Sequence, residues 1–279
     1  MKLNRTQWIA TGAFTVLLVG IYLFADTHKI ASEKPAGPTA SRDTQKEQVP
    51  EFDWDGYLKK VKSAITNQDT LSLLSDWEKT PSEANLKSLI SLYHKRGESV
   101  VEAYYTLNLA QQQKDPKLMA RAGDLFEATA AISDDNTLHQ YLADQAVLSY
   151  KSLLILDSTT ENRLKLATAY MDQGTAPMQG VGILLDVVSR DSNNADAQFL
   201  LGKFGMVSHQ YDKAIGRLEK VVYLRPQNYD ALFLLAEAYR EKGDKEKAIQ
   251  LLEKCSKMVD KPELKKEIEQ YISNIKAKG

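Results

Sequence analysis

The residue types that most often bind metals or act as nucleophiles are scattered along this chain. Its four histidines, His28, His94, His139 and His209, stand far apart, and none has the i, i+4 spacing of a metal-binding helix. The only cysteine, Cys255, excludes an internal disulfide. We therefore expect neither a metal site nor a bound cofactor.

Two further stretches resemble chemical motifs but have simpler explanations. Gly180-Val181-Gly182 has only two glycines, follows no strand and begins a helical pattern, so close packing explains it better than phosphate binding. Acidic pairs such as Asp134-Asp135 fall in turns, where they cap helices. An active site in the irregular region 117–157 would need a constellation of His, Cys or acidic residues, which is lacking there. The sequence predicts that the protein is not an enzyme.

Composition limits the classes of partner. With 36 Lys and Arg against 37 Asp and Glu, the net charge is -1, so bulk charge does not favour nucleic acid. Gly (14) and Pro (8) are sparse for 279 residues, which is typical of a nearly all-helical chain.

The chain repeats itself at an interval of 34 residues between Asn194 and Asp260. Each unit contains two apolar patterns of helical period, separated by a short polar turn. Such self-similarity is typical of a solenoid of stacked units, in which chain length sets the number of units. The matching pairs are Asn194 and Asn228, Leu201 and Leu235, Gly202 and Ala236, Ala214 and Ala248, and Leu218 and Leu252.

These units resemble the tetratricopeptide repeat (TPR) family. In that family, Leu and a small residue precede an aromatic in the first helix, Gly-Asp forms the turn, and Ala-x3-large follows in the second. The second copy reads Leu235-Ala236, Tyr239, Gly243-Asp244, Ala248 and Leu252, while the first has Gly205 in place of the aromatic. The resemblance implies an all-α fold, a right-handed α-solenoid of helix pairs. It also places Cys255 at a small packing position, where we expect a buried side chain.

Residues 81–262 accommodate about five units, which are clearest over 160–262. Residues 52–80 are expected to form N-terminal capping helices. The pair within 117–156 departs most from the family pattern. Residues 263–279 are predicted to form a C-terminal capping helix with one apolar face, made of Leu264, Ile268, Tyr271, Ile272 and Ile275.

Residues 1–26 are expected to be a single-pass transmembrane anchor. The apolar stretch 8–25 would span about 27 Å as a helix, close to the thickness of a bilayer core. Trp8 and Tyr22 suit the two interfaces, and Lys2 and Arg5 favour a cytoplasmic N-terminus. A cleaved signal peptide is the alternative, although Leu23 fits the cleavage pattern poorly.

Residues 27–51 are rich in Lys, Glu, Ser, Thr and Pro and have no apolar period. This composition predicts a disordered linker, with a reach on the order of 25–30 Å. Together with the anchor, it suggests a bacterial inner-membrane protein whose repeats lie in the periplasm.

The resemblance also implies where a partner binds, because the family binds extended peptides or helices on the concave face formed by first helices. Phe199, Met206 and Phe233 are expected to be exposed there, which suits a hydrophobic or amphipathic peptide. The alternative is that a neighbouring helix, such as the N-terminal cap or the linker, covers them. The residues predicted to bind the partner are Leu164, Thr168, Met171, Phe199, Lys203, Met206, Phe233, Glu237 and Arg240. The other positions expected to face the groove are Lys87, Ser91, His94, Lys95, Glu161, Asp172, Asp196, Val207, Asp230 and Glu241.

The function that the sequence favours is a membrane-tethered TPR scaffold that binds a protein or peptide, with envelope protein assembly or maturation as a candidate process. The basic arrangement that chaperone-binding repeats use for a C-terminal carboxylate is not reproduced. The alternative function is a structural module that associates with itself through the solenoid.

Overall fold

The computed structural model describes residues 51–277, which belong to the compact unit Val49–Gly279. This part of the chain is all-helical and contains no strand, as the sequence predicts. The helices are α2 (Trp54–Ser63), α3 (Gln68–Lys79), α4 (Glu83–Arg96), α5 (Ser99–Gln113), α6 (Pro116–Ala130), α7 (Asn136–Leu156), α8 (Thr160–Gln173), α9 (Pro177–Arg190), α10 (Ala195–Val207), α11 (Tyr211–Leu224), α12 (Tyr229–Glu241), α13 (Lys245–Met258) and α14 (Pro262–Ala277).

The predicted anchor in 1–26 and nearly all of the linker in 27–51 lie outside the described residues. Among residues 51–277, every helix is too short or too polar to cross a membrane.

Polar side chains set the starts of most helices by accepting hydrogen bonds from free backbone N–H groups in the first turn. Asn194 and Asn228, which lie 34 residues apart, cap α10 and α12 in the same way, through Ala197 N–H and Ala231 N–H. Asp135 caps α7, as predicted for the acidic pair in that turn. The other capping side chains are Asp53, Asn67, Ser82, Asp115, Thr159 and Asp244.

Residues with positive φ form several of the turns that follow helices. Gly97, Gly174 and Gly243 have φ of 74°, 73° and 84°, a conformation that glycine adopts without steric cost. His209 takes this conformation with φ of 57° and is exposed, so it is a solvated turn residue in a place where glycine is usual. Lys114 does the same after α5, with φ of 51°.

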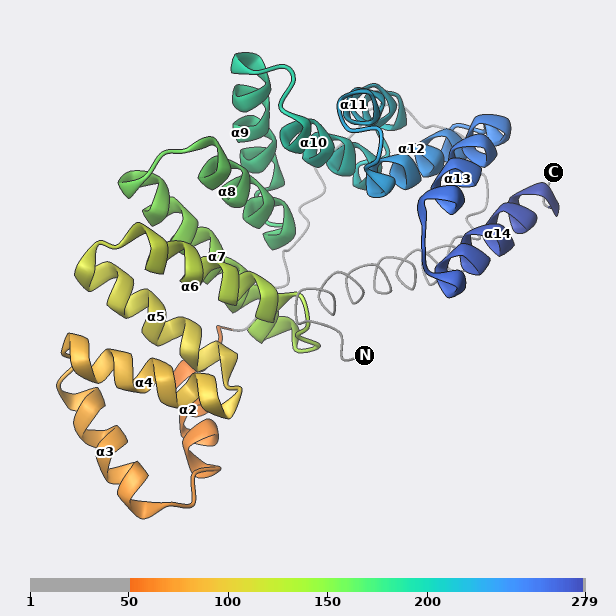
Figure 1. The fold of residues 1–279 in the computed structure, drawn as a ribbon. Coiled ribbons are helices and arrows are strands. Elements are labelled where there is room, and N and C mark those ends of the chain that lie inside the picture. The colour runs from red at the N-terminus through yellow and green to blue at the C-terminus, as the bar shows by residue number, and fades with distance from the viewer. Residues whose placement is uncertain (1–50, 278–279) are drawn as a thin grey trace, which may run out of the picture. The chain divides into compact units, whose positions relative to one another are not determined.

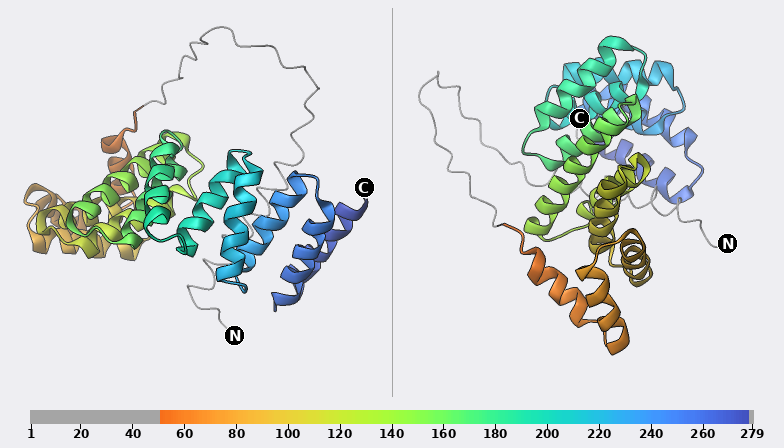
Figure 2. Two further views of the ribbon diagram at one scale, coloured as in Figure 1. Left: turned by 90° about the horizontal axis from the view of Figure 1, so that it is seen from above. Right: turned by 90° about the vertical axis from the view of Figure 1, so that its left-hand side faces the viewer.

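Five helix pairs follow one another from α4 to α13. We call α4, α6, α8, α10 and α12 the first helices, and α5, α7, α9, α11 and α13 the second helices. Each first helix packs against its own second helix, and α8, α10 and α12 also contact one another in order. Figures 1 and 2 show the pairs progressing in chain order from α4 to α13, with α14 packed on α13.

Small residues allow the paired helices to approach closely, because a larger side chain would meet the partner helix. A Cβ atom on Gly202 would lie 2.8 Å from the Leu218 side chain, and Leu218 is itself fully buried. Cys255 is also buried, as predicted, and desolvation raises the pKa of its thiol to about 12. It therefore acts as a small apolar residue rather than as a nucleophile.

An aromatic cluster that the sequence analysis did not identify holds the start of the described chain. Phe52 stacks on Tyr141 of α7, with ring centroids 4.6 Å apart. Trp54 lies 4.3 Å from the Tyr104 ring of α5 and 5.9 Å from that of Tyr141. Residue 52 and α2 are therefore joined by aromatic side chains to two second helices, and Tyr57 belongs to the same cluster.

Candidate functional site

A hollow of about 270 Å³ lies between the first helices α6, α8 and α10. Five of the positions predicted to face the groove line it, namely Glu161, Leu164, Thr168, Asp196 and Phe199. The remaining lining residues are Glu127, Lys165 and Leu200. The structure thus brings residues from three successive units together on the helices that the sequence analysis assigned to the groove.

Leu164, Phe199 and Leu200 form the apolar part of the hollow. All three side chains are partly exposed, so they are not fully buried in the core. Leu164 and Leu200 border the buried cluster around Leu184, while Phe199 borders the next cluster, around Leu218. These three residues form the apolar floor of the hollow. They pack against buried side chains and still expose apolar surface to a ligand.

The surroundings of the Glu127 carboxylate on α6 are unfavourable to its charge. It accepts a hydrogen bond of 3.1 Å from the Tyr150 hydroxyl and forms no ion pair with any residue in 51–277. Desolvation by the surrounding protein raises the pKa of Glu127, and the carboxylates of Asp172 and Asp124 raise it further. The Tyr150 hydrogen bond and Lys165 act in the opposite direction. A cation bound nearby would relieve this unfavourable environment.

Lys165, which lines the hollow, and Arg225, which contacts the lining residue Asp196, both have acidic partners. Lys165 pairs with Asp124, which also accepts a hydrogen bond of 2.7 Å from Tyr150. Arg225 pairs with Asp196 through two hydrogen bonds, of 2.6 and 2.9 Å. Positive charge in this region is therefore matched locally.

Lys203, another predicted groove residue, lies on α10 between two acidic groups of neighbouring first helices. Its charge lowers the pKa of Asp172 on α8 and of Asp230 on α12, but desolvation is the larger effect and raises both values. Much of each Asp residue is open to solvent, so we attribute the desolvation to protein that surrounds the carboxylates rather than to complete burial. Carboxylates that interact with Lys203 thus lie on both neighbouring first helices, α8 and α12.

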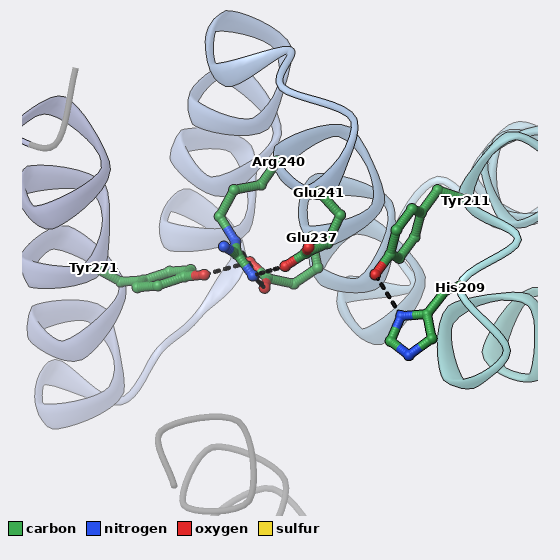
Figure 3. Close-up of polar contacts among 6 residues, drawn as sticks. All are labelled: His209, Tyr211, Glu237, Arg240, Glu241 and Tyr271. Atoms are coloured by element: carbon green, nitrogen blue, oxygen red, sulfur yellow. Dashed lines mark hydrogen bonds and ion pairs between the residues drawn. The ribbon is translucent and has the colours of Figure 1, made fainter. Parts of the chain in front are cut away.

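Two predicted groove residues of the fifth unit are buried, so the expectation that Phe233 is exposed is wrong. Phe233 and Glu237 are each only 3% exposed. The ring of Tyr271 on α14 lies 6.3 Å from that of Phe233, and its hydroxyl donates a hydrogen bond of 2.7 Å to Glu237 Oε1 (Figure 3). Tyr271 follows Glu237 by 34 residues, so α14 takes the place of a further first helix.

The polar contacts around Glu237 occupy Arg240 as well. Its guanidinium donates two hydrogen bonds of 3.1 Å to Glu237 Oε2 and also pairs with Glu241 (Figure 3). Beyond Glu241, the Tyr211 hydroxyl lies 2.7 Å from Nδ1 of His209. These side chains are engaged with one another, which makes this end of the groove a less suitable binding surface than the hollow.

The other predicted positions do not line the hollow. Met171 and Met206 are half-buried and pack against the clusters around Leu184 and Leu218. His94 lies with Nδ1 3.0 Å from the buried carboxylate of Glu102, which also pairs with Arg121. Sequence reasoning missed Glu127, Lys165 and Leu200 as lining residues. Lys165 and Leu200 could have been found only as the residues that follow Leu164 and Phe199. Glu127 could have been found only as an acidic residue on the first helix of the irregular unit.

Within the described part of the chain, no three His, Cys, Asp or Glu side chains gather in a way that could hold a metal ion.

A stack of two-helix units defines an α-solenoid. Residues 206–266 match the tetratricopeptide repeat family, which confirms the assignment made from the 34-residue period. These residues therefore contain tetratricopeptide repeats.

Solved structures with a similar fold include MamA from Desulfovibrio magneticus, with 18% identity, a TM-score of 0.49, and coverage of 63% of this chain and 94% of that one. The thermophilic TPR protein TTC0263 of Thermus thermophilus has 16% identity, a TM-score of 0.48, and coverage of 70% and 98%. YrrB, described as a TPR protein with an unusual peptide-binding site, has 15% identity, a TM-score of 0.46, and coverage of 71% and 97%. A comparison with curated proteins finds no significant match.

Proposed function

We propose that this protein is a membrane-tethered scaffold that binds a segment of a partner protein in the groove formed by its first helices. The observation that carries the proposal is the hollow between α6, α8 and α10, where Leu164, Phe199 and Leu200 expose apolar surface on a rigid support. A concave site lined by apolar side chains and a few polar groups is the usual form of a binding site.

The geometry favours an extended segment or a helix as the ligand. The lining residues come from three successive first helices, α6, α8 and α10, so a ligand that touches all of them must run across these helices. Thr168 adds a hydroxyl to this surface, while Glu127, Glu161 and Asp196 add carboxylates. Apolar pockets combined with fixed polar groups are how solenoid and groove proteins recognise peptides.

The test is to capture partners with the full chain in mild detergent and to compare matched variants. Leu164→Ala and Phe199→Ala remove apolar surface from the hollow, whereas Leu185→Ala removes an exposed leucine from the second helix α9. We expect a partner that is retained by the wild type and by Leu185→Ala and lost by the other two variants. Retention by all variants, with helical content unchanged, would contradict binding in the groove.

The tether is proposed on the sequence alone. Residues 8–25 would anchor the protein in a bacterial inner membrane, with the N-terminus in the cytoplasm and a right-handed solenoid in the periplasm, where envelope protein assembly or maturation takes place. Alkaline phosphatase or a fluorescent protein that matures only in the cytoplasm would be fused to the C-terminus. Phosphatase activity without fluorescence is expected, and the reverse result would place the repeats in the cytoplasm.

Self-association is the second candidate function, and exposed apolar residues on the second helices favour it. Leu148 and Ile155 lie seven residues apart on one face of α7 and are 45% and 85% exposed. Light scattering of the full chain would show a dimer that Ile155→Lys disrupts and Phe199→Ala does not. A monomer at micromolar concentration would exclude this candidate.

A further inference from the structure

We propose that the hollow between α6, α8 and α10 recognises a protein segment in which an apolar side chain stands next to a lysine or arginine. The apolar side chain would lie on Leu164, Phe199 and Leu200, and the cation would pair with Glu127. This inference rests on the proposed function and specifies the chemistry of its partner.

The size and lining of the hollow indicate a side chain as the apolar element. Pockets that hold drug-sized ligands and cofactors usually measure roughly 300–1,000 Å³. At about 270 Å³, this hollow lies below that range. Its apolar residues come from α8 and α10 at equivalent positions of two units, since Leu164 in α8 corresponds to Phe199 in α10. One large apolar side chain entering between these helices would contact both.

The balance of charge indicates the neighbouring cation. Three carboxylates and one ammonium line the hollow, namely Glu127, Glu161, Asp196 and Lys165. The ammonium is paired with Asp124, and Asp196 is paired with Arg225. Glu127 and Glu161 are left without an ion pair among residues 51–277, so the surface has an excess of negative charge to offer a ligand.

Glu127 is the better of these two carboxylates for specific recognition. It is half-buried beside the apolar floor, and it accepts a hydrogen bond of 3.1 Å from the Tyr150 hydroxyl, whose proton is shared with Asp124. The desolvation that raises the pKa of Glu127 would strengthen an ion pair formed there, because the pair is shielded from water. Glu161, in the first turn of α8, is exposed and would add only weaker, screened attraction.

The experiment is a selection of random 12-residue peptides displayed on phage against the immobilised full chain in detergent. Enriched sequences would be synthesised with a fluorescent label and titrated against wild type, Glu127→Gln and Glu219→Gln by polarisation. Glu219 is the matched control, because it also accepts a tyrosine hydrogen bond, from Tyr239, but lies on α11 and outside the hollow. Glutamine keeps that hydrogen bond in both variants and removes only the charge.

We expect enriched peptides to pair an apolar residue with Lys or Arg. Their Kd for Glu127→Gln should rise about tenfold or more, while Glu219→Gln stays within about twofold of wild type. Glu127→Lys should reject these peptides and accept versions whose Lys or Arg is changed to Glu. Such a reversal of charge preference would not result from a damaged fold.

The contrary outcomes separate this inference from the function on which it rests. Peptides that bind tightly and lose affinity with Phe199→Ala, but tolerate Glu127→Gln, would overturn the cationic specificity and leave the groove as the binding site. Peptides that are insensitive to both substitutions would overturn the groove as well. A selection that enriches no peptide would contradict both proposals.

Discussion

The close approach of α8 and α9 at Gly180 leads to a prediction with an internal control. Gly180 is buried, and a Cβ atom there would lie 2.4 Å from the carbonyl oxygen of Ala167 and 3.1 Å from Met171 Cγ. The methionine can rotate away, but the carbonyl oxygen belongs to the backbone of α8. Gly180→Ala therefore forces the two helices apart. Gly182, two residues later in α9, has open space around the same atom, with nothing within 4 Å.

The two substitutions should change the free energy of unfolding in opposite directions. Overpacking costs about 1–3 kcal/mol, and a clash with backbone belongs at the upper end of that range. Replacing glycine by alanine within a helix stabilises the helix by about 1 kcal/mol. Gly180→Ala should thus lower the free energy of unfolding by about 1–2 kcal/mol, whereas Gly182→Ala should raise it by about 0.5–1 kcal/mol.

Urea unfolding of the full chain, followed by far-ultraviolet circular dichroism, measures the difference between the two variants. The midpoint should fall for Gly180→Ala and rise for Gly182→Ala, with little change in the dependence on urea. Equal shifts for both variants, or a neutral Gly180→Ala, would refute the view that glycine at this position sets the distance between α8 and α9. Because Leu164 and Thr168 lie on α8, the Gly180 variant should also weaken ligand binding.

Three further predictions concern charge, a buried hydrogen bond and a strained turn. Desolvation raises the pKa of Glu127, so the folded state holds the Glu127 proton more tightly than the unfolded state. The stability that the protonated carboxyl contributes is therefore present at low pH and is lost as the pH rises through the pKa of Glu127 in the folded state. Glu127→Gln should therefore melt at a higher temperature than wild type at pH 7, and the difference should vanish below about pH 4. Tyr271→Phe leaves a buried oxygen of Glu237 without its donor and should cost about 1–3 kcal/mol in urea unfolding, while Tyr223→Phe, which is 80% exposed, should be neutral. Lys114→Gly should gain about 0.5–1 kcal/mol in the same assay, because its φ of 51° is costly for any residue with a Cβ.

Each of these outcomes has a clear opposite. A Glu127→Gln variant that is less stable than wild type at pH 7 would mean that the carboxylate is already well compensated. A neutral Tyr271→Phe would indicate that α14 is not held by this hydrogen bond. A destabilised Lys114→Gly would show that the lysine side chain contributes more than its backbone conformation costs.

The repeats were predictable because their signals are local. Asn194 and Asn228 cap α10 and α12, and the 34-residue repeat found between Asn194 and Asp260 coincides with the helix pairs α10–α11 and α12–α13. The apolar period, the polar turn and the cap all lie within one unit, so each unit can be read without knowing its neighbours.

Features that depend on contacts between units were harder to predict. Phe233 has the same position in its unit as Phe199, yet it is buried where Phe199 is partly exposed. The difference includes its contact with Tyr271 of α14, which exists only because the final helix packs as another first helix. The apolar pattern within one unit does not specify which helix packs against that unit next.

The hollow shows the same limit. Glu127 belongs to the unit that departs most from the family pattern, where equivalent positions are hard to assign, and its role depends on Tyr150, 23 residues away. The aromatic cluster of Phe52, Trp54 and Tyr141 likewise joins segments far apart in sequence. Such contacts follow from tertiary packing, which sequence periodicity does not specify.

Site-specific photo-crosslinking in living cells tests the central claim most directly. A photoreactive phenylalanine analogue would replace Phe199 in the hollow or, as a control, Tyr223, which is 80% exposed on the second helix α11. We expect a crosslinked partner protein from position 199 and none from position 223. A partner crosslinked only from position 223, or from neither position, would contradict binding in the groove of the first helices.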